Sequence, residues 1–132
     1  MMYIETSAII AMLAGEDEAE KMAHKIDKAT TNLITSPMSV TEATVRFATI
    51  KGIEILASQE LVSELLTTLK VQNISITPEI GNKAIRAYAQ YGKGTGHGAK
   101  LNLADVFSYA CAKAYRVPLL YKGNDFAKTD LA

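Results

Sequence analysis

The amino-acid sequence predicts an α/β protein with a short, mainly parallel central sheet. Apolar runs of three or four residues alternate with longer stretches in which apolar residues recur at the spacing of one helix face. Strands separated by helical stretches favour parallel pairing, because a parallel connection has to cross back along the sheet. A chain of 132 residues can bury a core of its own, so we expect a single domain over residues 1–132.

Apolar spacing and helix-end residues place the elements of the first half of the chain. Ala19, Met22 and Ile26 follow the i, i+3, i+7 spacing of a helix. Ser39 and Glu42 match the Ser-x-x-Glu pattern of a helix start, and Gly52 is typical of a helix end. The expected order is a strand at residues 2–4, helices at 7–13 and 19–26, a strand at 33–35, and helices at 39–51 and 55–69.

Capping residues and glycines place the elements of the second half. Thr77 followed by Pro78 is a typical helix start, and Asn102 is a typical N-cap. Four glycines fall within residues 92–100, which predicts a loop. The expected order is a strand at 74–76, a helix at 78–91, the loop, a helix at 103–115 and a strand at 118–121.

Composition excludes several classes of protein. With 48% hydrophobic and 21% charged residues, the sequence is neither that of a disordered chain nor that of a membrane protein. No apolar run approaches the ~20 residues of a membrane span. The first residues lack the features of a signal peptide, so we expect a cytoplasmic protein. The single cysteine, Cys111, lies at helical spacing among apolar residues, which predicts a buried apolar role rather than a nucleophilic one.

Charge is unevenly distributed although the formal total is zero. Residues 1–65 hold ten acids and five bases, whereas residues 66–132 hold four acids and nine bases. The basic half could face a polyanion such as a nucleic acid, although solvated helix faces give the same count.

Four isolated carboxylates, Glu5, Glu42, Asp105 and Asp125, stand where an apolar run gives way to a helix start or a turn. Such positions lie at the strand-end crevice where open α/β folds bind ligands. Carboxylates that converge repel one another unless a cation lies between them, and oxygen ligands suit Mg²⁺ or Mn²⁺. The pattern therefore predicts a hard-metal site.

Three of these acids also have a structural explanation. Glu42 can complete a capping box, Asp105 lies in the first turn of an expected helix, and Asp125 suits a turn. Glu5 differs, because the Thr6-Ser7 pair that follows it would cap the next helix better than a glutamate. The position of Glu5 therefore favours a functional role.

These residues lie in segments that resemble the motifs of PIN-domain proteins. The matching segments are, in chain order, Ile4-Glu5-Thr6-Ser7-Ala8-Ile9-Ile10, Ser39-Val40-Thr41-Glu42, residues 101–110 around Asp105, and Pro118-Leu119-Leu120-Tyr121-Lys122-Gly123-Asn124-Asp125-Phe126. The final Lys128-Thr129-Asp130-Leu131-Ala132 is similar to the ending of VapC-type toxins. Four motifs in register along one chain identify it as a member of this family.

The resemblance implies a three-layer α/β/α PIN-like fold and a metal-dependent endoribonuclease, the toxin of a toxin–antitoxin pair, acting on structured RNA of the tRNA or rRNA class. It also implies a homodimer neutralised by a VapB-like antitoxin. No protein nucleophile is required, because a bound Mg²⁺ or Mn²⁺ activates the attacking water.

The resemblance also assigns roles to residues. Glu5 and Asp105 are expected to hold the metal, and Glu42 and Asp125 to complete the catalytic acids or hold a second ion. Supporting roles fall to Thr6, Ser7 and Asn102. Contacts with the RNA backbone are expected from the glycine-rich loop, through Lys93, His97 and Lys100.

The chain departs from the family pattern at one position. Glu5 stands where the first motif has Asp, and its side chain is one methylene longer. Mg²⁺ tolerates little geometric error in its ligands. The alternative hypothesis is therefore a catalytically impaired PIN-fold module that binds RNA or an antitoxin.

Overall fold

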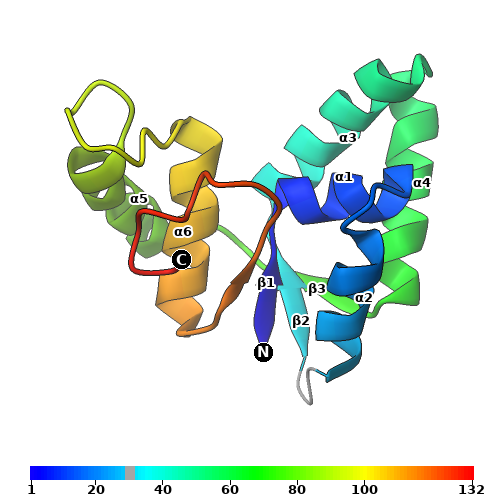
Figure 1. The fold of residues 1–132 in the computed structure, drawn as a ribbon, viewed down its shortest axis with the longest axis horizontal. Helices are drawn as coiled ribbons and strands as arrows, with labels where there is room; N and C mark the ends of the chain where they lie inside the picture. The colour runs from blue at the N-terminus through cyan, green and yellow to red at the C-terminus, as the bar shows by residue number, and fades with distance from the viewer. Residues whose placement is uncertain (29–31) are drawn as a thin grey trace.

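A computed structural model describes residues 1–28 and 32–132 of the protein (Figure 1). These residues contain β1 (Met2–Ile4), α1 (Thr6–Ala14), α2 (Ala19–Lys28), β2 (Leu33–Thr35), α3 (Pro37–Lys51), α4 (Ile55–Thr68), β3 (Val71–Asn73), α5 (Pro78–Tyr91), α6 (Leu103–Tyr115) and β4 (Leu119–Leu120). In this part of the chain, no helix combines the length and apolar character needed to cross a membrane.

The four strands form one parallel sheet in the order β3-β2-β1-β4. Met2 pairs with Leu33 of β2, and Ile4 pairs with Leu120 of β4. Since all four strands run in the same direction, their carboxyl ends lie at one edge of the sheet, where α1 and α3 begin. The predicted α/β fold with a short parallel sheet is confirmed.

Helices cover both faces of the sheet and give three layers. Figure 1 shows α5 and α6 on one side of the strands and α1 to α4 on the other. Successive strand residues point to opposite faces. Tyr3 and Ile34 accordingly pack in a core with α5 and α6, whereas Ile4 and Leu33 pack in a second core with the other four helices. Cys111 is fully buried in the first core, as its spacing predicts.

The third strand lies three residues earlier than the sequence predicts. The expected strand at 74–76 was wrong, because β3 is an edge strand that carries the exposed polar residues Gln72 and Asn73. Ile74 is buried directly after the strand, and its N–H donates to the carbonyl of Thr35 at 2.8 Å. The apolar pattern therefore marked a core contact that follows the strand rather than the strand itself.

The start of α3 also differs from the sequence prediction. Ser36 is the N-cap and Pro37 opens the helix, so Ser39 already lies inside the first turn and forms no capping box with Glu42. Ser39 is buried instead, and its hydroxyl lies 2.8 Å from the Tyr3 hydroxyl and 3.1 Å from that of Ser108 on α6. This buried polar cluster joins β1, α3 and α6, which are the elements that carry three of the four acids.

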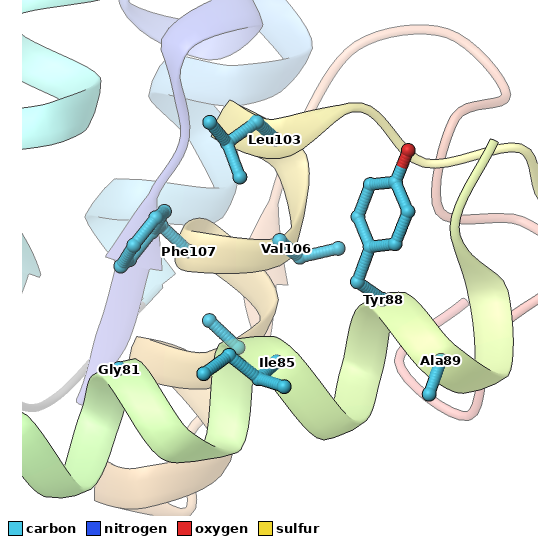
Figure 2. Close-up of a pocket in the computed structure, with 8 residues that line it drawn as sticks. Gly81, Ile85, Tyr88, Ala89, Leu103, Val106 and Phe107 are labelled. Atoms are coloured by element: carbon cyan, nitrogen blue, oxygen red, sulfur yellow. The ribbon is translucent and has the colours of Figure 1, made fainter.

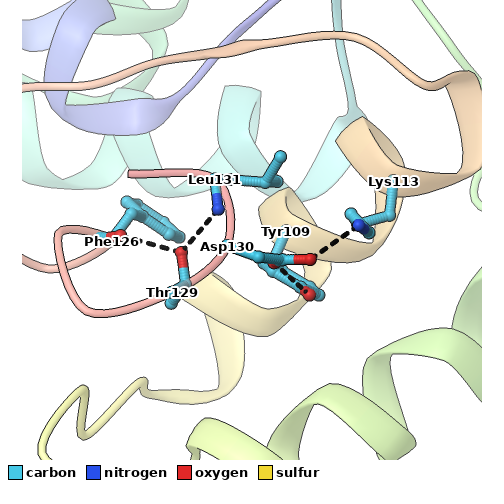
Figure 3. A network of polar contacts seen from close by, with 6 residues as sticks. All are labelled: Tyr109, Lys113, Phe126, Thr129, Asp130 and Leu131. Atoms are coloured by element: carbon cyan, nitrogen blue, oxygen red, sulfur yellow. Dashed lines mark hydrogen bonds and ion pairs between the residues drawn. The ribbon is translucent and has the colours of Figure 1, made fainter.

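The segment after β4 has no regular structure, but side-chain contacts fix it against α6. Figure 3 shows Asp130 between Tyr109 and Lys113, accepting from the tyrosine hydroxyl at 2.6 Å and from the lysine ammonium at 2.7 Å. The Lys113 ammonium and the Tyr109 hydroxyl hold the pKa of Asp130 below its ordinary value. Phe126 is buried beneath the same segment. Asp125 therefore lies in the segment between β4 and the buried Phe126.

Candidate active site

The carboxyl edge of the sheet bears a cavity of about 310 Å³ that contains three of the four predicted acids. We call it the carboxylate cavity. It is lined by side chains from α1, α3, α6 and the segments after β1 and β4, namely Glu5, Ser7, Ile10, Glu16, Arg46, Ile50, Asn102, Asp105, Lys122, Gly123 and Asp125. Parallel strand order produces this convergence, because β1 and β4 are neighbours and both end at the cavity.

Glu5 is buried at the end of β1, with 4% of its surface exposed. It is also the N-cap of α1, since its Oε2 accepts the N–H of Ser7 at 2.8 Å. From the sequence we expect Thr6 or Ser7 to be the better cap, but in the structure Glu5 is the N-cap. The side chain folds back toward a residue two positions ahead, and Oε1 has no hydrogen-bond partner among the described residues.

Ser7 connects Glu5 to the segment that follows the neighbouring strand β4. Its hydroxyl donates to Oε2 of Glu5 and accepts the backbone N–H of Lys122 at 2.8 Å. The single hydroxyl proton is thereby directed at the glutamate. Thr6 does not take part, because its fully buried hydroxyl points to the carbonyl of Ser39 at 3.5 Å.

Asp105 and Asn102 form a capping box at the start of α6. The Asn102 amide oxygen accepts the N–H of Asp105 at 2.8 Å, and Oδ2 of Asp105 accepts the N–H of Asn102 at 3.0 Å. Asp105 is nevertheless 6% exposed and lines the cavity. Oδ1 has no hydrogen-bond partner in the described part of the chain, so one carboxylate combines a capping oxygen with an unengaged one.

Glu42 and Asp125 lie farther from the centre of the cavity. Asp125 is exposed and lines it from the segment after β4. Glu42 is half-buried on α3 and does not line the cavity, but its charge acts on both Glu5 and Asp105. The structure therefore gives a buried pair of acids with two more acids around it.

Two cations of the cavity were not predicted. Arg46 lines it from α3, and Lys122 lines it from the end of β4. The Lys122 ammonium lies 2.6 Å from Glu16 and 3.6 Å from Glu18, both in the segment between α1 and α2. The spacing of Glu42 and Arg46, one helical turn apart, was the signal that could have placed the arginine at the site.

The glycine-rich loop does not contribute to the cavity. Lys93 and Lys100 are exposed, and neither they nor His97 line it. The His97 ring packs edge-on against Tyr91 with centroids 4.9 Å apart, and its Nδ1 accepts the N–H of Ala99 at 3.0 Å. His97 therefore orders the loop that carries the two lysines.

Burial makes ionisation of the central acids unfavourable. Burial, with smaller contributions from the charges of Asp105 and Glu42, raises the pKa of Glu5 to about 7 against the hydrogen bonds from Ser7. Burial likewise raises the pKa of Asp105 to about 6, with contributions from Asp125 and Glu42. A cation between these carboxylates would offset both the burial and the mutual repulsion.

The donor chemistry of the cavity fits a hard divalent ion held by two protein ligands. Among the described residues, no group of three or more His, Cys, Asp or Glu side chains is close enough to hold a metal ion. Mg²⁺, however, commonly binds through one or two carboxylates and keeps several waters. Glu5 and Asp105 offer such a pair, because both are buried and each has one oxygen without a hydrogen-bond partner in the described chain.

The buried charge of Glu5 predicts an unusual dependence of stability on pH. The folded pKa of about 7 exceeds the ordinary value of 4.5, so between these values the folded state binds more protons and stability falls as pH rises. In metal-free buffer, we expect Glu5→Gln to unfold at higher urea concentration than the wild type at pH 8, by roughly 2 kcal/mol, and at the same concentration at pH 4. Glu64→Gln, at an exposed position of α4, controls for the amide substitution. A Glu5→Gln variant less stable than the wild type at pH 8 would contradict this account.

Comparison with known proteins finds relatives that match nearly the whole chain. A VapC ribonuclease of Rhizobium meliloti (strain 1021) is 35% identical over 99% of this chain and 99% of its own length. Ribonuclease VapC42 of Mycobacterium tuberculosis (strain ATCC 25618 / H37Rv) is 33% identical over 98% of this chain and 96% of its own. Both similarities span the whole arrangement of strands and helices.

Solved structures show the same fold. VapC20 of Mycobacterium tuberculosis, a Sarcin-Ricin loop cleaving toxin, superimposes with a TM-score of 0.76 at 13% identity, covering 96% of this chain and 93% of its own. A toxin–antitoxin complex from Klebsiella pneumoniae superimposes with a TM-score of 0.72 at 20% identity, covering 98% of this chain and 93% of its own. The PIN domain model matches residues 2–131. The chain therefore belongs to the PIN-domain family, within its VapC ribonuclease group.

Proposed function

We propose that the protein is a metal-dependent endoribonuclease toxin that cleaves structured RNA, of the tRNA or rRNA class, in the cytoplasm. The observation that carries the proposal is the buried pair of Glu5 and Asp105 in one cavity. Burial raises the pKa of both acids, and a bound cation would stabilise their charged forms. The names of the relatives supply the reaction class: they are VapC ribonucleases, and one similar structure is that of a toxin that cleaves the Sarcin-Ricin loop.

The residues of the chain take distinct parts in this reaction. Glu5 and Asp105 would hold Mg²⁺ or Mn²⁺, which supplies the acidity that activates an attacking water and neutralises charge on the phosphate. Ser7 fixes the Glu5 carboxylate by donating to it, and Asn102 fixes that of Asp105 from its own backbone. Glu42 and Asp125 surround the pair with negative charge. Lys93 and Lys100, on the loop that His97 orders, would contact RNA away from the scissile bond.

An Asp105→Asn variant tests the metal site. The asparagine oxygen can still accept the N–H of Asn102, so the capping box and the fold should survive the change. We expect Mn²⁺ binding by calorimetry to be lost, together with Mn²⁺-dependent cleavage of a mixed tRNA and rRNA substrate. Glu79→Gln, an acid in the first turn of α5, is the matched control and should retain both. Wild-type metal affinity in Asp105→Asn would remove Asp105 from the site.

A Glu5→Asp variant distinguishes an active enzyme from an impaired binding module. An error of ~1 Å in ligand position costs about 10²-fold in rate, which is the basis of the impaired alternative. In the structure, however, the Glu5 side chain folds back toward Ser7, so the extra methylene does not extend the carboxylate farther into the cavity. We therefore expect single-turnover cleavage rates of wild type and Glu5→Asp to agree within about tenfold. An inactive wild type together with a much higher cleavage rate in Glu5→Asp would favour the catalytically impaired binding module.

The partner surfaces are proposed from two apolar regions. Ile50 lines the carboxylate cavity and is 56% exposed, and it continues toward Ile55 and Leu56 at the start of α4, which are 54% and 72% exposed. We propose that a VapB-like antitoxin covers this face and the cavity beside it. One of the similar solved structures is a toxin–antitoxin complex from Klebsiella pneumoniae, which supports such a partner.

The second apolar region lies between α5 and α6 and suits a second copy of the chain. The groove between these two helices has a volume of about 410 Å³. Figure 2 shows Ile85 and Leu103 among its lining residues, and these two side chains are 70% and 66% exposed. The groove is lined by Gly81, Ala84, Ile85, Tyr88, Ala89, Leu103, Val106 and Phe107. Protruding branched side chains next to small ones make a surface that can pack on itself, so we propose a homodimer through this groove.

A charge in the groove should separate the two copies. We expect Ile85→Glu to sediment as a monomer at micromolar concentration where the wild type sediments as a dimer, because a carboxylate at the centre of an apolar interface loses its hydration. Leu56→Glu, equally exposed but on α4, should remain a dimer. A dimer in Ile85→Glu and a monomer in Leu56→Glu would place the interface on the other face.

A further inference from the structure

Arg46 lines the carboxylate cavity, where its charge acts on Asp105 without an ion pair between the two side chains. It follows Glu42 by one turn on α3 and precedes Ile50 by one turn, so the helix presents the three residues on one face. Its side chain is exposed, and it makes no hydrogen bond or ion pair with any residue that the structure describes. No hydrogen bond or ion pair with a described residue therefore fixes the rotamer of Arg46 beside the acids.

The other cation of the cavity is already neutralised. The Lys122 ammonium is held by Glu16 and Glu18 at 2.6 and 3.6 Å. Its backbone N–H is used as well, since it donates to Ser7. Among the described residues that line the cavity, Arg46 is thus the only cation without a carboxylate within ion-pair distance.

An unpaired cation in the cavity would favour the entry of RNA. A phosphodiester is an anion, and it would approach Glu5, Asp105 and Asp125 with Glu42 close behind. A metal ion offsets only part of this repulsion, and the paired Lys122 offsets none. A guanidinium can donate two parallel hydrogen bonds to the oxygens of one phosphate, and it stays charged at every relevant pH.

Resting on the ribonuclease function proposed above, we propose that Arg46 binds the RNA phosphate at the scissile position through its guanidinium. The ligand class is a phosphodiester of the RNA backbone, not a base, so the contact carries affinity and position rather than sequence preference. Arg46 also lowers the pKa of Asp105, after larger effects from burial and from the other acids, which agrees with its position beside the buried pair.

The test compares RNA binding and cleavage by three variants of the full chain. Arg46→Gln removes the charge, and Arg46→Lys keeps the charge without the paired N–H donors of the guanidinium. Lys51→Gln is the control, because it removes an exposed charge from the same helix outside the cavity. Binding is measured as fluorescence anisotropy of a labelled tRNA in Ca²⁺ over a range of salt concentrations. Cleavage is measured separately in Mn²⁺.

We expect Arg46→Gln to weaken tRNA binding roughly tenfold and to raise KM more than it lowers kcat. The slope of log binding constant against log salt concentration should become shallower by about one. Arg46→Lys should recover the salt slope but only part of the affinity. Binding by Arg46→Gln equal to that by Lys51→Gln would overturn the proposal. So would a variant that changes only Mn²⁺ affinity, because Arg46 would then serve the carboxylates. A wild type that binds tRNA but cleaves no RNA would overturn the ribonuclease function alone, since the binding comparison still decides the role of Arg46.

Discussion

Burial of the Glu5 carboxylate at the end of β1 is the constraint on which the rest of this structure depends. A carboxylate that is 4% exposed needs hydrogen-bond donors, and Ser7 supplies two of them, from its backbone and its hydroxyl. The same hydroxyl accepts from the residue after β4, so the ends of two neighbouring strands are fixed to one side chain. Parallel pairing makes this possible, because only parallel strands bring two carboxyl ends together at adjacent positions. Asp105 then enters from α6, whose start is held by its own capping box.

The arrangement is unfavourable for folding, and the remainder of the molecule offsets it. Glu5 and Asp105 have raised pKa values, so their charged forms oppose folding near neutral pH. Two apolar cores on opposite faces of the sheet provide the opposing stabilisation. The hydroxyls of Tyr3, Ser36 and Ser39 add a satisfied polar cluster directly beneath the site. A satisfied buried network specifies one arrangement of the helices around it, which keeps α3 and α6 at a fixed distance from β1.

The sequence predicted the features that local chemistry determines, and it failed where tertiary contacts decide. Glu5 and Asp105 were predicted to converge from their positions after a strand and at a helix start, and both line the same cavity. The position of β3 was wrong, because an edge strand does not need apolar residues and the buried Ile74 lies just beyond it. Ser39 was assigned to a cap, although its hydroxyl is used in the core. Arg46 and Lys122 were missed because nothing local distinguishes a cation at the site from one in solvent. Only the folded arrangement shows that Lys122 is paired with Glu16, whereas Arg46 forms no ion pair with a described residue.

The first turn of α6 lies between the apolar groove and the carboxylate cavity, for both of which we propose partners. Leu103 lines the apolar groove between α5 and α6, whereas Asn102 and Asp105 line the carboxylate cavity. The capping box makes these residues one unit, since the Asp105 carboxylate and the Asn102 amide each accept from the other's backbone. A second copy packed on Leu103 would therefore restrict the same turn that aims Asp105. Loss of local motion at a ligand residue lowers the entropy cost of binding a cation there. Dimer formation and metal binding would then strengthen each other through one turn of helix, without any change in backbone path.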